Sequence, residues 1–263
     1  GGVPKDGIPS IDNPDYVSAN QADMWIEDNE LVLGLKYKDS IVAYPLQIMV
    51  WHEIVNENID GDPLLITYCP LCGTGIAFKR TIKKEAVEFG TSGKLYNSNL
   101  VMYDRKTDSY WNQLGGKAIV GELTGKVLKQ VPISTTSWRE WKKENPDTMV
   151  LSKKTGYDRP YGNDPYGNYY EDSFLLFPVE NEDNRIHPKT VIHGIEYEGT
   201  YKAYRDDDID DKITDTIGNA TAIISKTKDG IVTAEINNNT IVPTRSFFFF
   251  LYAFHPETKL YEE

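Results

Sequence analysis

The sequence is poor in cysteine and histidine, since its 263 residues include only two cysteines and four histidines. Both cysteines, Cys69 and Cys72, stand three positions apart. A single pair cannot form the disulfide framework that stabilises small secreted domains, so this pair is a candidate for metal binding or redox chemistry. Long apolar runs are also missing. The longest, residues 247–254, has the length of a strand, whereas a membrane-spanning helix needs roughly 18 residues. We therefore expect no transmembrane segment in this chain.

Positive charge is scarce as well. Lysine and arginine total 28 against 40 acidic residues, and the formal net charge is −12. Nucleic-acid-binding proteins usually present a basic face, so we expect no nucleic-acid partner. The first residues lack the apolar core of a secretory leader, so we expect this numbering to begin after any leader. No G-x-S-x-G, H-E-x-x-H, P-loop or G-x-G-x-x-G pattern occurs in the right context, which argues against the common hydrolases and nucleotide-binding enzymes.

Strand patterns dominate what is present. Short β-branched and aromatic runs separated by polar turns cover much of the first half and recur in the second. Two helices are expected. One covers residues 46–56, and the other starts at Ser137, with Glu140 in capping-box position, and ends before Asn145 and Pro146. The sequence therefore predicts an α+β fold that is predominantly β, with a few short helices.

A weak internal repeat is visible. Glycine, tyrosine, alanine and tyrosine recur in register when residues 34–44 are aligned with residues 194–204. Two further similarities pair residues 55–59 with 213–217 and residues 103–107 with 254–258. We infer two degenerate β-rich repeats, roughly residues 31–120 and 190–263. The predicted domains are an extended N-terminal segment over 1–30, a first repeat over 31–155 that carries the site, and a second over 156–263 that serves as scaffold. One continuous domain is the alternative.

The cysteines lie in the run Tyr68-Cys69-Pro70-Leu71-Cys72-Gly73, between two strand patterns. Proline presets φ for a tight turn, and the following glycine permits a backbone conformation closed to other residues. Such a turn can direct two thiolates at one metal ion, as the knuckles of rubredoxins and zinc ribbons do. Those proteins use two knuckles, whereas this chain has one, so further ligands have to come from elsewhere.

The main rival is a thiol–disulfide pair. In thioredoxin-like proteins the reactive thiolate lies at a helix N-terminus, whereas here the pair precedes Gly73-Thr74-Gly75 and a strand pattern. A structural disulfide, inert thiols, and a Cys72 nucleophile with His52 as its base also remain open.

His52 is the best candidate for a third ligand, because it lies on the expected helix beside Trp51 and has no counterpart in the second repeat. The simpler interpretation is that His52 is a core residue whose ring is hydrogen-bonded to a backbone carbonyl. The neighbouring Glu53 fits a supporting role better than ligation. Met102 and His255 are weaker candidates for a fourth ligand, as is an exogenous group.

Two thiolates and an imidazole form a soft ligand set that suits copper or zinc and argues against magnesium or calcium. A structural zinc site wants four protein ligands, and three can be named. We therefore favour copper, with zinc as the alternative.

Several longer motifs resemble one family. They include Trp51-His52-Glu53-Ile54-Val55-Asn56, Thr67-Tyr68-Cys69-Pro70-Leu71-Cys72-Gly73-Thr74 and Asn97-Ser98-Asn99-Leu100-Val101-Met102-Tyr103-Asp104-Arg105. They are similar to the domain-of-unknown-function 3179 family of bacteria and archaea, over nearly the whole chain. The resemblance implies no activity, but it implies an extracytoplasmic setting, periplasmic or at the cell surface, because such proteins are often exported.

The first hypothesis is therefore an extracytoplasmic copper-binding protein, more a carrier than an enzyme, that uses His52, Cys69 and Cys72 for copper handling or electron transfer. A redox protein or a metallochaperone is its expected partner. The alternatives are a thiol–disulfide oxidoreductase that uses the same cysteines, and a non-catalytic binding module with a structural disulfide.

Overall fold

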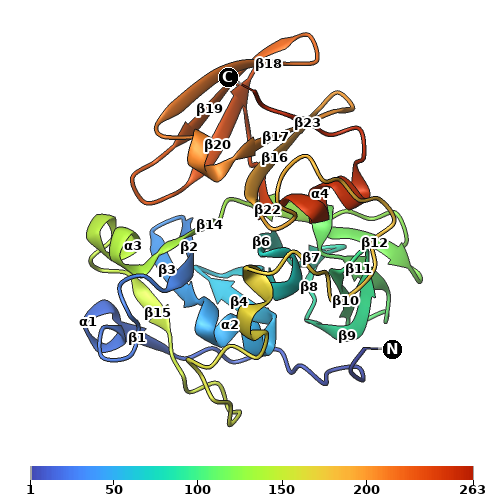
Figure 1. Cartoon of the computed structure of the whole chain (residues 1–263). Helices are drawn as coiled ribbons and strands as arrows, with labels where there is room; N and C mark the ends of the chain where they lie inside the picture. The colour runs from blue at the N-terminus through green and yellow to red at the C-terminus, as the bar shows by residue number, and fades with distance from the viewer. Residues whose placement is uncertain (1, 263) are drawn as a thin grey trace.

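The structure is a computed structural model and describes residues 2–262. Strands account for 43% of the chain and helices for 15%, so the fold is α+β and predominantly β. In Figure 1 the C-terminal strands, drawn in orange and red, lie above the blue, green and yellow parts of the chain. None of the helices within residues 2–262 has the length and apolarity that a membrane crossing requires.

The first sheet combines the N-terminal segment with the first hairpin. The N-terminal segment is not wholly extended, because Ser18 forms a capping box with Gln21 and starts a short helix. The indoles of Trp138 and Trp141, from the helix that begins at the predicted cap Ser137, pack on one face of this sheet. The elements are, in spatial order, β1 (Tyr16–Ser18), β15 (Met149–Leu151), β3 (Ser40–Pro45), β2 (Leu31–Tyr37) and β14 (Ser134–Ser137), with helices α1 (Ala19–Ala22) and α3 (Trp138–Glu144).

Two further sheets complete the first half. One carries the cysteine turn between its strands β5 and β6, and the other is inserted after β6. The first contains β13 (Lys129–Val131), β6 (Thr74–Lys79), β5 (Asp62–Cys69) and β4 (Ile54–Ile59), preceded by α2 (Leu46–His52). Between β5 and β6 lies η1 (Pro70–Cys72). The second contains β12 (Lys117–Val120), β11 (Tyr110–Asn112), β10 (Asn99–Asp104) and β9 (Phe89–Tyr96), with β7 (Thr81–Ile82), β8 (Glu85–Ala86) and η2 (Leu114–Gly116) nearby in sequence.

The second half contains two four-stranded sheets. The first consists of β22 (Thr244–Phe247), β16 (Val191–Tyr197), β17 (Thr200–Arg205) and β23 (Lys259–Leu260), with helix α4 (Phe248–Phe254). The second consists of β18 (Lys212–Ile217), β19 (Ala220–Lys226), β20 (Val232–Ile236) and β21 (Asn239–Ile241). The single-turn helices η3 (Gly167–Tyr170) and η4 (Asp206–Asp208) lie in the connections.

The halves share one layout. In each, a hairpin pairs with a later strand, a short helix follows, and a last strand adds in parallel to the hairpin, as β14-β2-β3-β15 and β22-β16-β17-β23. The sheets β4-β5-β6-β13 and β18-β19-β20-β21 also correspond strand for strand. In both halves, the hydroxyl of a buried tyrosine donates to a carboxylate on the next sheet. Tyr44 donates to Glu57 at 3.0 Å, and Tyr204 donates to Asp215 at 2.7 Å.

This layout corrects one sequence alignment. Residues 254–258 correspond to residues 144–148, not to 103–107. Residues 144–148 begin at the end of α3, residues 254–258 begin at the end of α4, and both make the same turn. The N–H of Thr148 donates to the carbonyl of Asn145, and the N–H of Thr258 donates to the carbonyl of His255. Residues 103–107 belong instead to an insertion between β6 and β13. In the second half the corresponding strands, β20 and β21, are joined only by a two-residue turn at Asn237 and Asn238.

Helix α2 is shorter than the sequence predicts. It ends at His52, and Glu53 takes a left-handed conformation with φ of 59°, after which β4 begins at Ile54. The alternating residues of β4 pair with β5, so tertiary strand pairing overrides the helical spacing there.

A matched glycine pair tests the shared layout. A Cβ on Gly34 would lie 2.3 Å from the Trp141 ring, and a Cβ on Gly194 would lie 2.6 Å from a terminal methyl of Leu251. Because an indole cannot move as a leucine methyl can, we expect Gly34→Ala to lower the free energy of unfolding by about 2–3 kcal/mol and Gly194→Ala by about 1 kcal/mol or less. Urea unfolding of both variants measures this. Equal losses, or none, would contradict this packing.

Candidate functional site

The cysteine turn is compact and buried. Cys69 ends β5, η1 carries Cys72, and Gly73 follows with φ of 60°. A Cβ on Gly73 would lie 2.8 Å from the Phe247 ring, so both conformation and packing require glycine here. The two sulfur atoms are 2.7 Å apart, and the residues are 2% and 0% exposed. The sulfurs are therefore in direct contact with each other and shielded from solvent.

The inserted sheet supplies the groups that surround the sulfurs. Asn97 and Ser98, with φ of 48° and 61°, form the two-residue turn between β9 and β10. The Ser98 carbonyl lies 3.3 Å from Sγ of Cys72 and 3.7 Å from Sγ of Cys69, and Nδ2 of Asn99 donates to Sγ of Cys72 at 3.4 Å. The second half lacks this insertion and therefore has no equivalent environment.

A buried polar network holds Asn99 in place. Its Nδ2 donates to Oε1 of Gln113 at 2.8 Å, and its Oδ1 accepts from the N–H of Leu114 at 3.0 Å. Nε2 of Gln113 in turn donates to Oγ1 of Thr67 at 2.9 Å and to the carbonyl of Thr74 at 3.1 Å. The network thus joins the inserted sheet to both strands that flank the cysteine turn.

The two thiols are electrostatically unequal. Burial raises the pKa of Cys69, but hydrogen bonds from the Cys72 thiol and from the backbone N–H groups of Leu100 and Cys72 outweigh it, so its pKa lies below the ordinary value. Burial, and the proton that Cys72 shares with Cys69, raise the pKa of Cys72 well above the ordinary value. Cys69 is therefore the thiol of the pair that loses its proton more readily, with Cys72 as the hydrogen-bond donor to its thiolate.

Glu53 adds to this asymmetry. Burial, and the negative charge of Cys69, raise the pKa of the Glu53 carboxyl well above its usual range. The protonated form of Glu53 is therefore favoured, which lessens the repulsion between its carboxyl group and a Cys69 thiolate.

A segment of the connection between the halves covers the site; we call residues 164–180 the strap. The hydroxyl of Tyr169 donates to the carbonyl of Leu71 inside the cysteine turn at 3.0 Å, and Oγ of Ser98 donates to the carbonyl of Phe177 at 3.0 Å. The ammonium of the buried Lys189 lies 3.7 Å from the Tyr169 ring centre and donates to the carbonyl of Phe174 at 2.7 Å. The strap, drawn in yellow in Figure 1, thereby closes the turn and its hairpin from solvent.

His52 is buried, but its ring is engaged elsewhere. Nδ1 lies 2.7 Å from the carbonyl of Pro9, and Nε2 lies 2.6 Å from the hydroxyl of Tyr161, which also contacts Thr155. Burial lowers the pKa of His52, the Pro9 carbonyl opposes this, and the charge of Arg159 adds to it. Neutral His52 thus joins the N-terminal segment to the connection between the halves.

The two weaker ligand candidates lie in different parts of the molecule. Met102 packs in the same hydrophobic cluster as Cys69 and Cys72. His255 lies in the second half, where its ring stacks on Tyr201 with centres 3.7 Å apart.

The donor set does not fit a metal ion as these side chains lie. Two thiolates on one tetrahedral ion, each at 2.3 Å, would have sulfurs about 3.8 Å apart, whereas here the distance is 2.7 Å. Within residues 2–262, no three of the histidine, cysteine, aspartate and glutamate side chains lie so that they could hold a metal ion together. His52, Cys69 and Cys72 as a ligand set, and copper or zinc as the ion, stay predictions.

Sequence reasoning did not identify Asn99, Gln113 or Tyr169 as part of the site. The signal for Asn99 is the Asn97-Ser98-Asn99 run, which reads as a turn and carries part of the family resemblance. Gln113 and Tyr169 follow no local pattern, because their roles depend on contacts with residues 39 and 98 positions away.

One family model, described as a protein of unknown function (DUF3179), matches residues 5–248. Comparison with curated proteins and with solved structures found no match.

Proposed function

The chain belongs to the DUF3179 family, and from its own residues we propose that it is a thiol–disulfide redox protein whose Cys69 and Cys72 exchange two electrons with a partner disulfide. The observation that carries this proposal is the direct contact of the sulfurs at 2.7 Å, with Cys69 stabilised as a thiolate. A thiolate is the nucleophile in disulfide exchange, and a neighbouring thiol can resolve the mixed disulfide.

The reaction balances with these two residues alone. The Cys69 thiolate attacks one sulfur of the partner disulfide, which forms a mixed disulfide and releases one partner thiolate. The Cys72 thiol gives its proton to that leaving thiolate and attacks Cys69. The Cys69–Cys72 disulfide forms, the second partner thiolate leaves, and the partner has gained the two electrons that the pair has lost.

Access requires movement, because both sulfurs are buried beneath the strap. The hydroxyl of Tyr169 and the ammonium of Lys189 hold the strap by hydrogen bonds to backbone carbonyls, so it can open without breaking any strand pairing. The partner is thus a protein disulfide or a small disulfide whose approach coincides with strap opening.

Copper handling or electron transfer is the second candidate. The hydrogen bonds to Cys69 that stabilise its thiolate also suit a soft metal ligand. This candidate requires the sulfurs to separate and His52 to leave Pro9 and Tyr161, or another ligand to replace it. An extracytoplasmic location, which the family resemblance implies, is a further proposal and suits either function.

A redox titration with elemental analysis separates these candidates. We expect purified, untagged protein to contain no stoichiometric copper or zinc, two titratable thiols after native reduction, and none after oxidation. Intermediate buffers of reduced and oxidised dithiothreitol should give a two-electron transition. Stoichiometric metal that falls in His52→Ala would overturn this in favour of copper binding. A disulfide that native reduction leaves intact would indicate a structural bond.

A further inference from the structure

A cavity of about 480 Å³ lies beside the cysteine turn, where the two halves and the strap meet. Leu31, Leu46 and Val50 of the first half and Val191 and Phe247 of the second form its apolar wall. Neither cysteine lines it, so its chemistry is separate from that of the thiols. Its size suits a small organic molecule.

Arg245 supplies the free charge of this cavity. Its Nη1 donates to the carbonyl of Gly73 at 3.1 Å, and no carboxylate within residues 2–262 lies within 4.0 Å of its guanidinium. Asp206, the nearest acidic influence, is already held by Lys226 at 2.9 Å and His193 at 2.6 Å. A guanidinium has five donors in a planar fork that matches a carboxylate, so most of these donors remain for a ligand.

The other charged groups of the cavity are satisfied by the protein. Asp164 accepts from the hydroxyl of Tyr170 at 2.9 Å, and Glu30 accepts from Nε2 of Gln47 at 2.9 Å. Lys189 donates to strap carbonyls. The lining therefore holds two carboxylates and two cations, and Arg245 is the one of the four whose hydrogen-bonding groups are largely unused.

Two uncharged polar atoms also lack partners. The hydroxyl of Tyr68, which borders the cavity, makes no hydrogen bond with any group in residues 2–262. Arg245 lies close enough to lower the pKa of Tyr68, although burial, the largest influence, raises it, so the hydroxyl stays protonated and can donate. Oε1 of Gln47 is buried without a donor, and Gly162 leaves space beside it because a Cβ there would still be 3.8 Å away.

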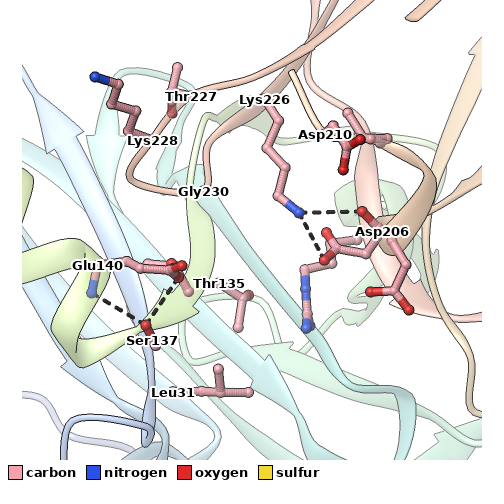
Figure 2. A pocket seen from close by; sticks show the side chains of 14 residues that line it. Leu31, Thr135, Ser137, Glu140, Asp206, Asp210, Lys226, Thr227, Lys228 and Gly230 are labelled. Carbon is pink, nitrogen blue, oxygen red and sulfur yellow. Dashed lines mark hydrogen bonds and ion pairs between the residues drawn. The ribbon is translucent and has the colours of Figure 1, made fainter. Parts of the chain in front are cut away.

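A second cavity, of about 530 Å³, is more acidic. Figure 2 shows it between the halves, with Lys226 bonded to Asp206 and Glu140 bonded to Ser137. Its remaining charged residues, Asp207, Asp210 and Lys228, include both signs. This cavity also borders Arg245, but it presents four acidic residues, Glu140, Asp206, Asp207 and Asp210, against two in the cavity beside the cysteine turn, so it repels an anion more strongly.

We propose that the cavity beside the cysteine turn binds a small organic carboxylate, with Arg245 and Tyr68 donating to the carboxylate and Gln47 accepting from a donor group on the ligand. The apolar wall takes the body of the molecule, and the carboxylate pairs with a guanidinium that has no protein carboxylate within 4.0 Å among residues 2–262. Because residues of both halves line the cavity, a bound ligand also stabilises the region where the halves meet.

Three matched probes test this inference by isothermal titration calorimetry on the whole chain. They are 4-hydroxybenzoate, which has the carboxylate and the donor, benzoate, which lacks the donor, and 4-hydroxybenzamide, which lacks the charge. We expect 4-hydroxybenzoate to bind roughly tenfold or more tightly than the amide, and benzoate to fall between them.

Two variants and a control complete the test. Arg245→Gln should weaken 4-hydroxybenzoate binding roughly tenfold or more, whereas Arg139→Gln, an exposed arginine, should leave it unchanged. Arg245→Gln also removes a bond to Gly73, so Tyr68→Phe is the second variant. Because the Tyr68 hydroxyl has no protein partner, this variant should keep the wild-type melting temperature and still bind several-fold more weakly. Equal binding of acid and amide, no binding up to about 10 mM, or equally tight binding of sulfate would overturn the proposal.

Discussion

Cys69→Ser should abolish disulfide exchange, whereas in Cys72→Ser the reaction should stop at the mixed disulfide between Cys69 and the partner. The reason is the unequal environment of the sulfurs, which lowers the pKa of Cys69 and raises that of Cys72. Without Cys72, nothing resolves the mixed disulfide, so it accumulates. Intact mass after incubation with oxidised glutathione measures this. An adduct on both variants, or on Cys69→Ser alone, would contradict the assignment.

The pH dependence of the same reaction follows from the pKa of Cys69. Only the thiolate attacks, so the rate rises with pH through the pKa of Cys69 and levels off above it. Because that pKa lies below the ordinary cysteine value, we expect the midpoint of the wild-type rate profile to lie lower than that of a free cysteine.

The strap should limit how fast reagents reach the sulfurs. Tyr169→Ala removes both the bond to Leu71 and the ring beneath Lys189, so we expect faster reaction with oxidised glutathione. Tyr157→Ala is the matched control, because Tyr157 lies outside the strap and is 45% exposed. Equal rates in both variants would show that access does not run past Tyr169.

Asn99→Ala should cause a large loss of stability. Asn99 is fully buried, and its removal leaves Oε1 of Gln113 and the N–H of Leu114 without partners. Each unsatisfied group costs about 1–3 kcal/mol, so we expect the free energy of unfolding to fall by about 2–4 kcal/mol. Urea unfolding measures this loss. Asn58→Ala, on the exposed side of β4, should change stability by about 0.5 kcal/mol or less.

The same variant should alter the thiols. Asn99 donates a hydrogen bond that lowers the pKa of both cysteines, alongside the larger influence of burial, which raises them. Its loss therefore moves the pH–rate midpoint of Asn99→Ala upward relative to the wild type. A stability loss with an unchanged midpoint would restrict Asn99 to a structural role.

Several features follow from local sequence because local physics determines them. Proline and glycine around Cys69 and Cys72 specify a tight turn, and the structure has that turn, with Gly73 left-handed. Ser137 starts a helix because its side chain accepts from the N–H of Glu140. The β-rich composition and the family membership were likewise readable from residue patterns and motifs.

Other features depended on tertiary contacts. Helical spacing extended α2 beyond His52, but pairing of β4 with β5 ended it there. The ring of His52 is directed to Pro9 and Tyr161, 43 and 109 positions away, and no local pattern specifies such partners. The environment of the sulfurs comes from an insertion and a strap, whose contacts with the turn join residues 26 and 98 positions apart.

The sequence by itself determined the cysteine turn, its place in one half of the chain, and the family. The tertiary structure alone decided what surrounds the sulfurs, and that environment sets their chemistry. Backbone conformation at a turn depends on the residues in the turn, whereas the pKa and exposure of a buried thiol depend on every group that folding brings to it.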